Sequence, residues 1–446
     1  MRDIPVTKLP LDPGPSAWNA LLEAPKPPIV LADDLKADFI VIGAGFAGLA
    51  AGRRLSQLCP GERIVLLEAS RVAEGPAGRN SGFMIDLPHD LSSADYGGAV
   101  EADAELTDDN RHAIAFAAQM AADFGLGTDV FARSGKINGA ATAKGTAHNK
   151  KHAAHLAAMG EPYEILNSAQ MQSLTGTRYY QSGLYTAGTA MLQPAAFVRG
   201  VAAGLASNRF QVFENSPVVN LSQDGDWTAK TPTGSVTAPK VILAVNGHLN
   251  SFGFKENRLM HVFTYASMTE PLSPEAKDAL GGAPEWSITP ADPMGTTVRR
   301  IATAQGDRLL IRNRFTYDPS MEVSDARISR VAHNHDRAFA ARFPMLPKLG
   351  MAYRWGGRLC LSRNNVSVVE ELEPGLYAAC CQNGLGTARG TLSGLLAAEL
   401  ATGHRSERLS RALNMPQPAK LPPAFLMRPG AAATLRWQEF RAGAER

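Results

Sequence analysis

The segment from Asp38 to Glu68 constrains the fold more than any other part of the chain. A short apolar run, DFIVI at 38–42, leads into the glycine-rich turn GAGFAG, and apolar residues at helical spacing follow it. A second apolar run, RIVLL at 63–67, ends beside Glu68. This order predicts a strand, a tight turn, a helix and a second, parallel strand, which is the repeating unit of doubly wound α/β folds.

Each glycine of the turn has a physical role. Gly43 permits the tight turn, Gly45 lets the backbone approach a pyrophosphate, and Gly48 lets the helix pack closely on the strand. The helix N-terminus offers unpaired N–H groups and a positive dipole end to phosphates. Glu68, twenty residues after the last glycine, can accept hydrogen bonds from ribose hydroxyls and would repel a 2′-phosphate. The unit predicts an adenine-dinucleotide site that disfavours NADP; the alternative is a purely structural glycine turn.

Length and charge narrow the class of protein. The 446 residues exceed what one hydrophobic core usually organises, so more than one domain is expected. The 45 Lys and Arg are nearly balanced by 42 Asp and Glu, so the sequence lacks the positive charge typical of a nucleic-acid-binding protein. The four cysteines show no CxxC spacing, so neither a metal site nor a disulfide framework is expected. The N-terminus lacks the pattern of a secretory signal, and no run approaches the ~20 apolar residues that span a bilayer. A globular, cytoplasmic protein is expected.

On a larger scale, several segments resemble those of one known family. DFIVIGAGFAGLAAGRRL, IVLLEA, GPAGRNSGF, VILAVNGH and GLYAACCQNGLGTARGTLSGLLAAEL follow, in order, the pattern of the D-amino-acid oxidase (DAO) superfamily of FAD-dependent amine oxidoreductases. The chain is most similar to the branch that includes glycine oxidase, sarcosine oxidases and γ-glutamylputrescine oxidoreductases. The resemblance implies an α/β fold in which a Rossmann-like FAD-binding domain is interleaved with a smaller substrate domain built on a mixed or antiparallel β-sheet. The implied boundaries are a leader at 1–37, an FAD-binding domain at 38–100, 195–255 and 355–410, a substrate domain at 101–194 and 256–354, and a C-terminal extension at 411–446.

The resemblance also places the FAD site on particular residues. The ADP half would lie against Gly43, Gly45, Phe46, Ala47, Gly48, Glu68, Ala69 and Val218. The pyrophosphate and flavin would lie against Gly78, Arg79, Asn80, Ser81, Ala244, Gly247, Asn383, Gly384, Leu385, Gly386 and Thr387. The last of these open a helix whose positive end would stabilise negative charge on the reduced flavin. Two positions depart from the family pattern, because Ala77 replaces a common serine and Leu385 a common histidine.

The reaction implied by the resemblance is oxidation of a C–N bond in a small amine or amino acid. Hydride would pass from the carbon beside a neutral amine to flavin N5, the imine would be hydrolysed, and oxygen or another acceptor would reoxidise the flavin. The segment GLGTARG opens a helix with no following strand, so a second dinucleotide site for NAD(P) is not expected. Because a fold does not determine a function, two alternatives stay open. They are hydroxy-acid oxidation with the same cofactor, and a flavin-binding role in RNA modification or in a larger complex.

The candidate substrate residues each have a structural interpretation as well. Arg312 and Arg314 lie two apart on an expected strand and would face the same side, where a carboxylate could bind, although such a strand can also pair with surface acids. Tyr265 and Trp355 could wall the pocket or belong to the core. The remaining candidates, as proton acceptors or as contacts to substrate or flavin carbonyls, are His89, His261 and Gln382.

Cys360 raises the question of covalent flavin attachment, because some sarcosine oxidases bind the flavin through a cysteine in this neighbourhood. Its position is one residue out of register, which on a strand predicts a side chain on the wrong face. Noncovalent FAD is therefore the expectation.

Overall fold

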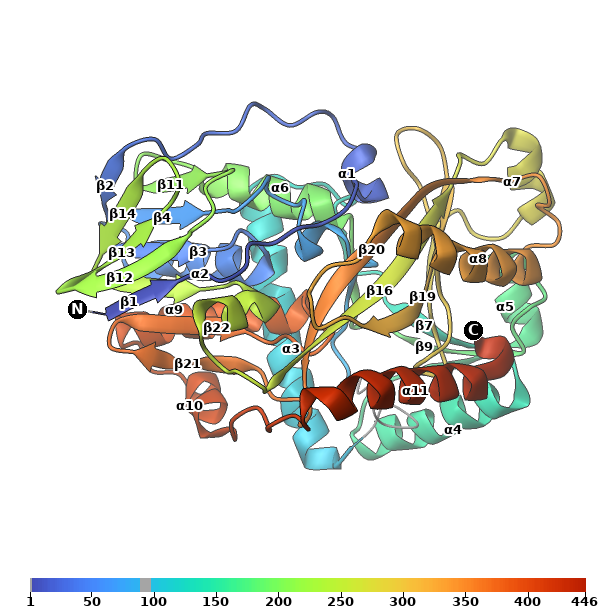
Figure 1. Cartoon of the computed structure of the whole chain (residues 1–446). Helices are drawn as coiled ribbons and strands as arrows, with labels where there is room; N and C mark the ends of the chain where they lie inside the picture. Colours follow the sequence, from blue (N-terminus) through green and yellow to red (C-terminus); the bar gives the residue numbers. More distant parts are fainter. Residues whose placement is uncertain (1, 89–97) are drawn as a thin grey trace.

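A parallel sheet forms one half of the molecule (Figure 1). The computed structural model describes residues 2–88 and 98–446. The strands of this sheet are β3 (Phe39–Ile42), β4 (Ile64–Leu67), β11 (Phe210–Phe213), β15 (Lys240–Leu243), β21 (Val368–Glu373) and β22 (Leu376–Cys380). Their order is β11-β4-β3-β15-β22-β21; the first five are parallel and β21 is antiparallel to β22.

Close helix packing covers this sheet. All residues of β3 and β4 are buried, as expected for parallel strands with both faces covered. Helix α2 (Phe46–Leu58) packs against α9 (Ala388–Thr402), and α3 (Val100–Asp123) and α6 (Pro194–Leu205) pack beside them. A Cβ on Gly394 would lie 1.9 Å from the backbone oxygen of Ala47, so a glycine is required where α9 meets α2.

A larger sheet forms the other half of the molecule. It contains β7 (Lys136–Ala140), β8 (Glu164–Asn167), β9 (Ser182–Thr186), β16 (Leu259–Thr269), β17 (Trp286–Pro290), β18 (Thr297–Ile301), β19 (Arg308–Tyr317) and β20 (Met351–Ser362). The order is β20-β16-β19-β18-β17-β7-β9-β8, and only the β17–β7 pair of these described strands is parallel. Helices around it are α4 (Ala143–Ala158), α5 (Ser168–Thr175), α7 (Pro274–Leu280), α8 (Asp325–Arg342) and α11 (Ala424–Ala442).

The two sheets confirm the predicted α/β fold with a mixed second sheet. Strand β20 belongs to the larger sheet as far as Ser362, past residue 355, where the FAD-binding domain was expected to resume. The domain boundaries stay a prediction. No helix in the described part of the chain has both the length and the apolar character that crossing a membrane requires.

Two smaller sheets complete the fold. One has the order β1-β12-β13-β14-β2, with β1 (Arg2–Pro5), β2 (Asp34–Lys36), β12 (Asn220–Asp224), β13 (Asp226–Lys230) and β14 (Ser235–Ala238). The other contains β5 (Phe83–Met84), β6 (Phe131–Ala132) and β10 (Ala190–Leu192). The short helical elements are α1 (Ala17–Ala20), α10 (Glu407–Asn414) and the 3-10 turns η1 (Pro76–Gly78), η2 (Asn246–Phe252) and η3 (Gly443–Glu445). The pattern over 235–245 predicts one strand, which is wrong: Pro239, which has no N–H to donate, separates β14 from β15, and these belong to different sheets.

Candidate functional site

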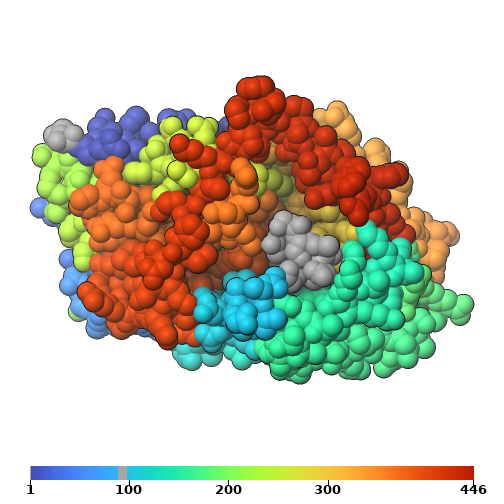
Figure 2. Space-filling model, turned by 90° about the horizontal axis from the view of Figure 1, so that it is seen from below, coloured from blue at the N-terminus to red at the C-terminus, as the bar shows by residue number. Residues whose placement is uncertain are grey.

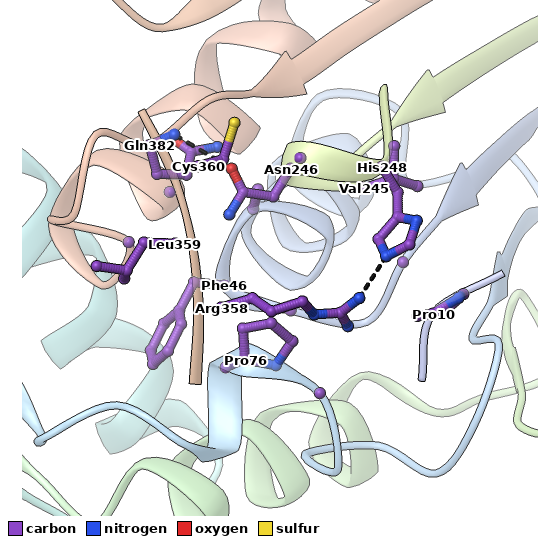
Figure 3. Close-up of a pocket in the computed structure, with 18 of the residues that line it drawn as sticks. Pro10, Phe46, Pro76, Val245, Asn246, His248, Arg358, Leu359, Cys360 and Gln382 are labelled. Carbon is purple, nitrogen blue, oxygen red and sulfur yellow. Dashed lines mark hydrogen bonds between the residues drawn. The ribbon is translucent and has the colours of Figure 1, made fainter. Parts of the chain in front are cut away.

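A large cavity lies at the carboxyl ends of β3, β4 and β15, the edge where α/β sheets bind ligands. One wall consists of the glycine turn after β3, the end of β4, the η2 turn after β15 and the segment between β22 and α9. The larger sheet supplies the facing wall through β17, β18, β19 and β20. Figure 3 shows residues of both sheets, and in it Cys360 of β20 lies close to Gln382 and Asn246.

The three glycines have the geometry that their predicted roles require. Gly43 has a φ of +104°, and a Cβ there would lie 2.8 Å from the backbone oxygen of Ala244. A Cβ on Gly48 would lie 1.8 Å from the oxygen of Gly43, so helix and turn can approach this closely only with glycine. Gly45 lines the cavity and caps α2 without a side-chain hydrogen bond, so the first N–H groups of α2 are available to a phosphate.

Glu68 lies at the end of β4 and lines the cavity. Its Oε2 accepts a hydrogen bond from Ala44 N at 2.8 Å, and its Oε1 accepts one from Ser70 N at 3.1 Å. Burial raises the pKa of Glu68, and these backbone N–H groups oppose that shift by stabilising the carboxylate. Two fixed backbone donors hold the carboxylate in place, with lone pairs left to accept from ribose hydroxyls.

At the other end of this wall, the segment before α9 reaches the cavity. Thr387 caps α9 without a side-chain bond to the helix, because its Oγ1 donates to Phe83 O at 2.7 Å. A Cβ on Gly386 would meet nothing within 4 Å, so this part of the wall is open. Two uncapped helix N-termini and a carboxylate therefore form a donor and acceptor set that fits FAD.

Most of the residues predicted to hold FAD line this cavity, and their contact with FAD stays a prediction. Those that line it are Gly43, Gly45, Phe46, Ala47, Glu68, Ala69, Asn80, Ser81, Val218, Ala244, Gly247, Asn383, Gly384, Leu385, Gly386 and Thr387. Gly48 and Gly78 do not line it: a Cβ on Gly78 would lie 1.9 Å from Ala73 O, so this glycine also serves close packing. Arg79 is not a lining residue either.

Arg79 instead holds the N-terminal leader against the cavity. Its buried guanidinium donates to backbone oxygens of Glu74 at 2.6 Å, Pro13 at 3.1 Å and Gly356 at 3.3 Å, and also to that of Gly14. Farther along the leader, Trp18 is buried and donates from Nε1 to Asn80 O at 2.7 Å. The leader thereby contributes lining residues that sequence reasoning missed, namely Val6, Lys8, Leu9, Pro10 and Asp12.

An ion pair joins the leader to the facing wall. Arg358 of β20 lines the cavity and donates from Nη2 to Asp12 Oδ2 at 2.7 Å. Its Nη1 contacts Nε2 of His248, as the dashed line in Figure 3 marks. Burial and the charge of Arg358 lower the pKa of His248 to about 3, so the imidazole is neutral. The leader is thus fastened across the cavity at Asp12.

A row of polar side chains crosses the facing wall. Thr297 of β18 pairs with Arg312 of β19, and in the antiparallel register of β17 and β18 it lies opposite Thr289. All three residues line the cavity, and the Thr289 hydroxyl donates to Asn138 Oδ1 at 2.7 Å. Sequence reasoning found Arg312 and missed both threonines. Arg312 is at the end of this row, and a guanidinium beside the Thr297 hydroxyl is a suitable site for a carboxylate.

The prediction that Arg314 shares this face is wrong. The pairing of β16 and β19 shifts register between Thr264 and Tyr265, opposite Arg314, which has a φ of +69°. This bulge adds a residue and interrupts the alternation of side chains. Arg314 pairs instead with buried Glu439 of α11.

Tyr265 and Trp355 are fully buried and do not line the cavity. The Tyr265 hydroxyl hydrogen-bonds Thr316 Oγ1 at 2.7 Å, and its ring packs in a cluster with Phe263 and residues of α8. Trp355 donates from Nε1 to Arg79 O at 2.9 Å. Tyr265 and Trp355 therefore belong to the core and do not form a wall of the pocket.

His261 and Gln382 line the cavity but are bound to the protein. His261 Nε2 bonds Asn250 Oδ1 at 3.1 Å, and burial together with Arg358 lowers the pKa of His261 to about 4. Such a histidine is a poor proton acceptor near neutral pH. Gln382 Nε2 donates to Ala379 O at 3.0 Å, and its Oε1 accepts from Ser393 Oγ at 3.1 Å. His89 lies outside the described residues.

Cys360 is among the residues that line the cavity, but so are its neighbours Arg358 and Leu359, so the face that its thiol occupies stays a prediction. Hydrogen bonding to Cys381 and burial raise the pKa of the Cys360 thiol well above its usual value. A neutral thiol is a weak nucleophile. Across the described residues, no group of three or more His, Cys, Asp or Glu side chains is arranged to hold a metal ion.

Comparisons with known proteins agree with this geometry. The model of the DAO family, described as FAD dependent oxidoreductase, matches residues 38–400. Probable oxidoreductase OrdL of Rhizobium meliloti (strain 1021) is 23% identical over 416 residues, which cover 89% of this chain and 90% of that protein. γ-Glutamylputrescine oxidoreductase of Escherichia coli (strain K12) is 24% identical over 397 residues, covering 86% and 88%. The crystal structure of glycine oxidase from Geobacillus kaustophilus has the same fold, with a TM-score of 0.68 at 17% identity over 84% of this chain and 96% of that one.

Proposed function

Because the chain belongs to the DAO family of FAD-dependent oxidoreductases, we propose that it oxidises the C–N bond of a small amino acid or of an amine that carries a carboxylate. Bound FAD would supply the chemistry by accepting a hydride from the carbon next to the amine. The names of two similar proteins, γ-glutamylputrescine oxidoreductase and glycine oxidase, support a substrate of this class. The four free cysteines support the reducing cytoplasm as its location.

The row formed by Thr289, Thr297 and Arg312 carries the proposal. The guanidinium would bind the substrate carboxylate through two parallel hydrogen bonds, and the Thr297 hydroxyl would donate a further one, whereas the Thr289 hydroxyl donates to Asn138 Oδ1. Anchoring the carboxylate there would turn the rest of the substrate toward the opposite wall, where Ser81 and Gly386 line the cavity.

The charges of the lining residues determine whether the substrate amine would be protonated or neutral. The carboxylates among the described lining residues are Asp12 and Glu68, neither of which belongs to the facing wall, and Asp12 is paired with Arg358. The positive charge of Arg312 would disfavour a protonated amine beside it and so would favour the neutral form that loses hydride. We therefore expect kcat/KM to rise with pH until the amine is neutral.

The test is anaerobic reduction of the holoenzyme by matched compounds. An amino acid, the corresponding 2-hydroxy acid and the decarboxylated amine are added in turn, and loss of flavin absorbance is followed. We expect the amino acid to reduce the flavin, and we expect Arg312→Met to raise its half-saturating concentration more than about tenfold. The matched control is Arg330→Met, which removes an exposed arginine of α8.

Other outcomes would contradict the proposal in different ways. Reduction by the hydroxy acid alone would assign the enzyme to C–O oxidation. Equal reduction by the amine and the amino acid would remove the carboxylate site from Arg312. Bound FAD that none of the three compounds reduces would favour a flavin-binding role without this chemistry.

A further inference from the structure

The C-terminal helix α11 carries large apolar side chains that the described part of the chain leaves exposed. The exposed fractions are 76% for Phe425, 52% for Leu426, 58% for Trp437 and 81% for Phe440. Phe425 and Leu426 lie near the start of the helix, before Pro429, and Trp437 and Phe440 lie three residues apart on one face near its end. These two exposed apolar pairs are together called the apolar ridge of α11.

The exposed charges on the same helix have one sign. Arg428 and Arg441 are exposed, and neither has an ion-pair partner among the described residues. The guanidinium carbon of Arg441 lies over the Trp437 ring, 4.7 Å from the ring centroid. The acid of α11, Glu439, is buried and is bound by Arg314 and Arg436. The exposed face of α11 is therefore apolar and positively charged.

Helix α4 extends this surface. Lys144 Nζ donates to Arg441 O at 3.1 Å, so the two helices are neighbours. Lys150 and Lys151 are exposed on α4, and the helix sequence contains no acidic residue. Figure 2 shows the α11 and α4 segments, red and teal, on the same face of the molecule.

We propose that the exposed faces of α11 and α4 bind the surface of an anionic lipid membrane. Aromatic side chains with neighbouring arginines on one helical face suit the boundary between headgroups and acyl chains, and the lysines of α4 would add attraction to anionic headgroups. A second copy of this chain is a poorer occupant of the same ridge. A two-fold contact there would bring Arg428 and Arg441 of both copies together without acids to neutralise them.

The experiment measures co-sedimentation of the FAD-loaded full-length protein with vesicles. Phosphatidylcholine vesicles are compared with vesicles in which one-third of the lipid is phosphatidylglycerol. We expect binding to the anionic vesicles, weakened as salt shortens the screening length from about 8 Å to about 3 Å. The double variant Trp437→Ser/Phe440→Ser should weaken binding by about tenfold or more. Arg428→Gln/Arg441→Gln should weaken it by about tenfold.

The matched control removes exposed apolar side chains elsewhere. Ile29→Ser/Ile165→Ser replaces residues that are 67% and 48% exposed outside α11 and should leave vesicle binding unchanged. FAD content and the thermal midpoint confirm that each variant is folded. The proposal is overturned if the wild-type protein does not sediment with anionic vesicles, or if the α11 variants bind as the control does. A wild-type dimer that the Trp437 and Phe440 substitutions dissociate would overturn it too, by assigning the ridge to a second copy.

Discussion

Replacing Gly48 with alanine should destabilise the protein, although alanine is the better helix former by about 1 kcal/mol in a helix interior. The new Cβ would lie 1.8 Å from the oxygen of Gly43 and 3.0 Å from its carbonyl carbon, and both are backbone atoms. Helix α2 would have to move by about 1 Å away from the turn, which would disturb its packing against α9. Overpacking of this kind costs about 1–3 kcal/mol or more, which outweighs the gain in helix propensity.

Gly45→Ala is the matched comparison, because its Cβ would meet only the Ala77 Cβ, at 3.6 Å. The apoprotein should change in stability by less than about 1 kcal/mol. The methyl group would instead occupy the cavity where the pyrophosphate is expected, and we expect the Kd for FAD to rise about tenfold or more. Urea unfolding of the apoproteins and fluorescence titration with FAD separate the two effects. An unchanged or higher urea midpoint for Gly48→Ala, or normal FAD affinity for Gly45→Ala, would refute this reasoning.

Two further predictions concern the leader and a buried histidine. Asp12→Asn removes the ion pair with Arg358, so we expect FAD to dissociate about tenfold faster in a stopped-flow release assay. The control Asp3→Asn should not change the dissociation rate. Equal dissociation rates for the two variants would show that the leader does not retain FAD. Burial lowers the pKa of His335 from 6.5 to about 4. As pH falls from 6.5 toward 4, this imidazole is protonated in the unfolded chain but stays neutral in the folded chain. The free energy of unfolding therefore falls by about 3 kcal/mol over this range. His335→Gln should flatten that part of the profile of urea midpoint against pH, and an unchanged slope would contradict the assignment.

The parts of the site that sequence predicts are those set by local geometry. The turn from Gly43 to Gly48 and the carboxylate of Glu68 depend on residues within one βαβ unit, so spacing and residue type are enough to find them. Thr289 and Thr297 depend on the register of three strands, and a threonine in a strand is too common to signal a site. The leader could not be placed either, because Asp12 meets Arg358 across 346 residues of sequence.

The error at Arg314 has a different cause, and a signal for it was present in the sequence. Alternation along LLIRNRF assumes a regular strand, whereas the bulge opposite Thr264 and Tyr265 turns Arg314 toward α11. Helix α11 contains a single acid, Glu439, in an apolar and basic segment. A buried carboxylate needs charged or hydrogen-bonding partners, and Glu439 obtains them from Arg314, from Arg436 and from the N–H of Phe315. An isolated acid in such a helix therefore indicates that it has a charged partner elsewhere in the chain, and Arg314 is one of these partners.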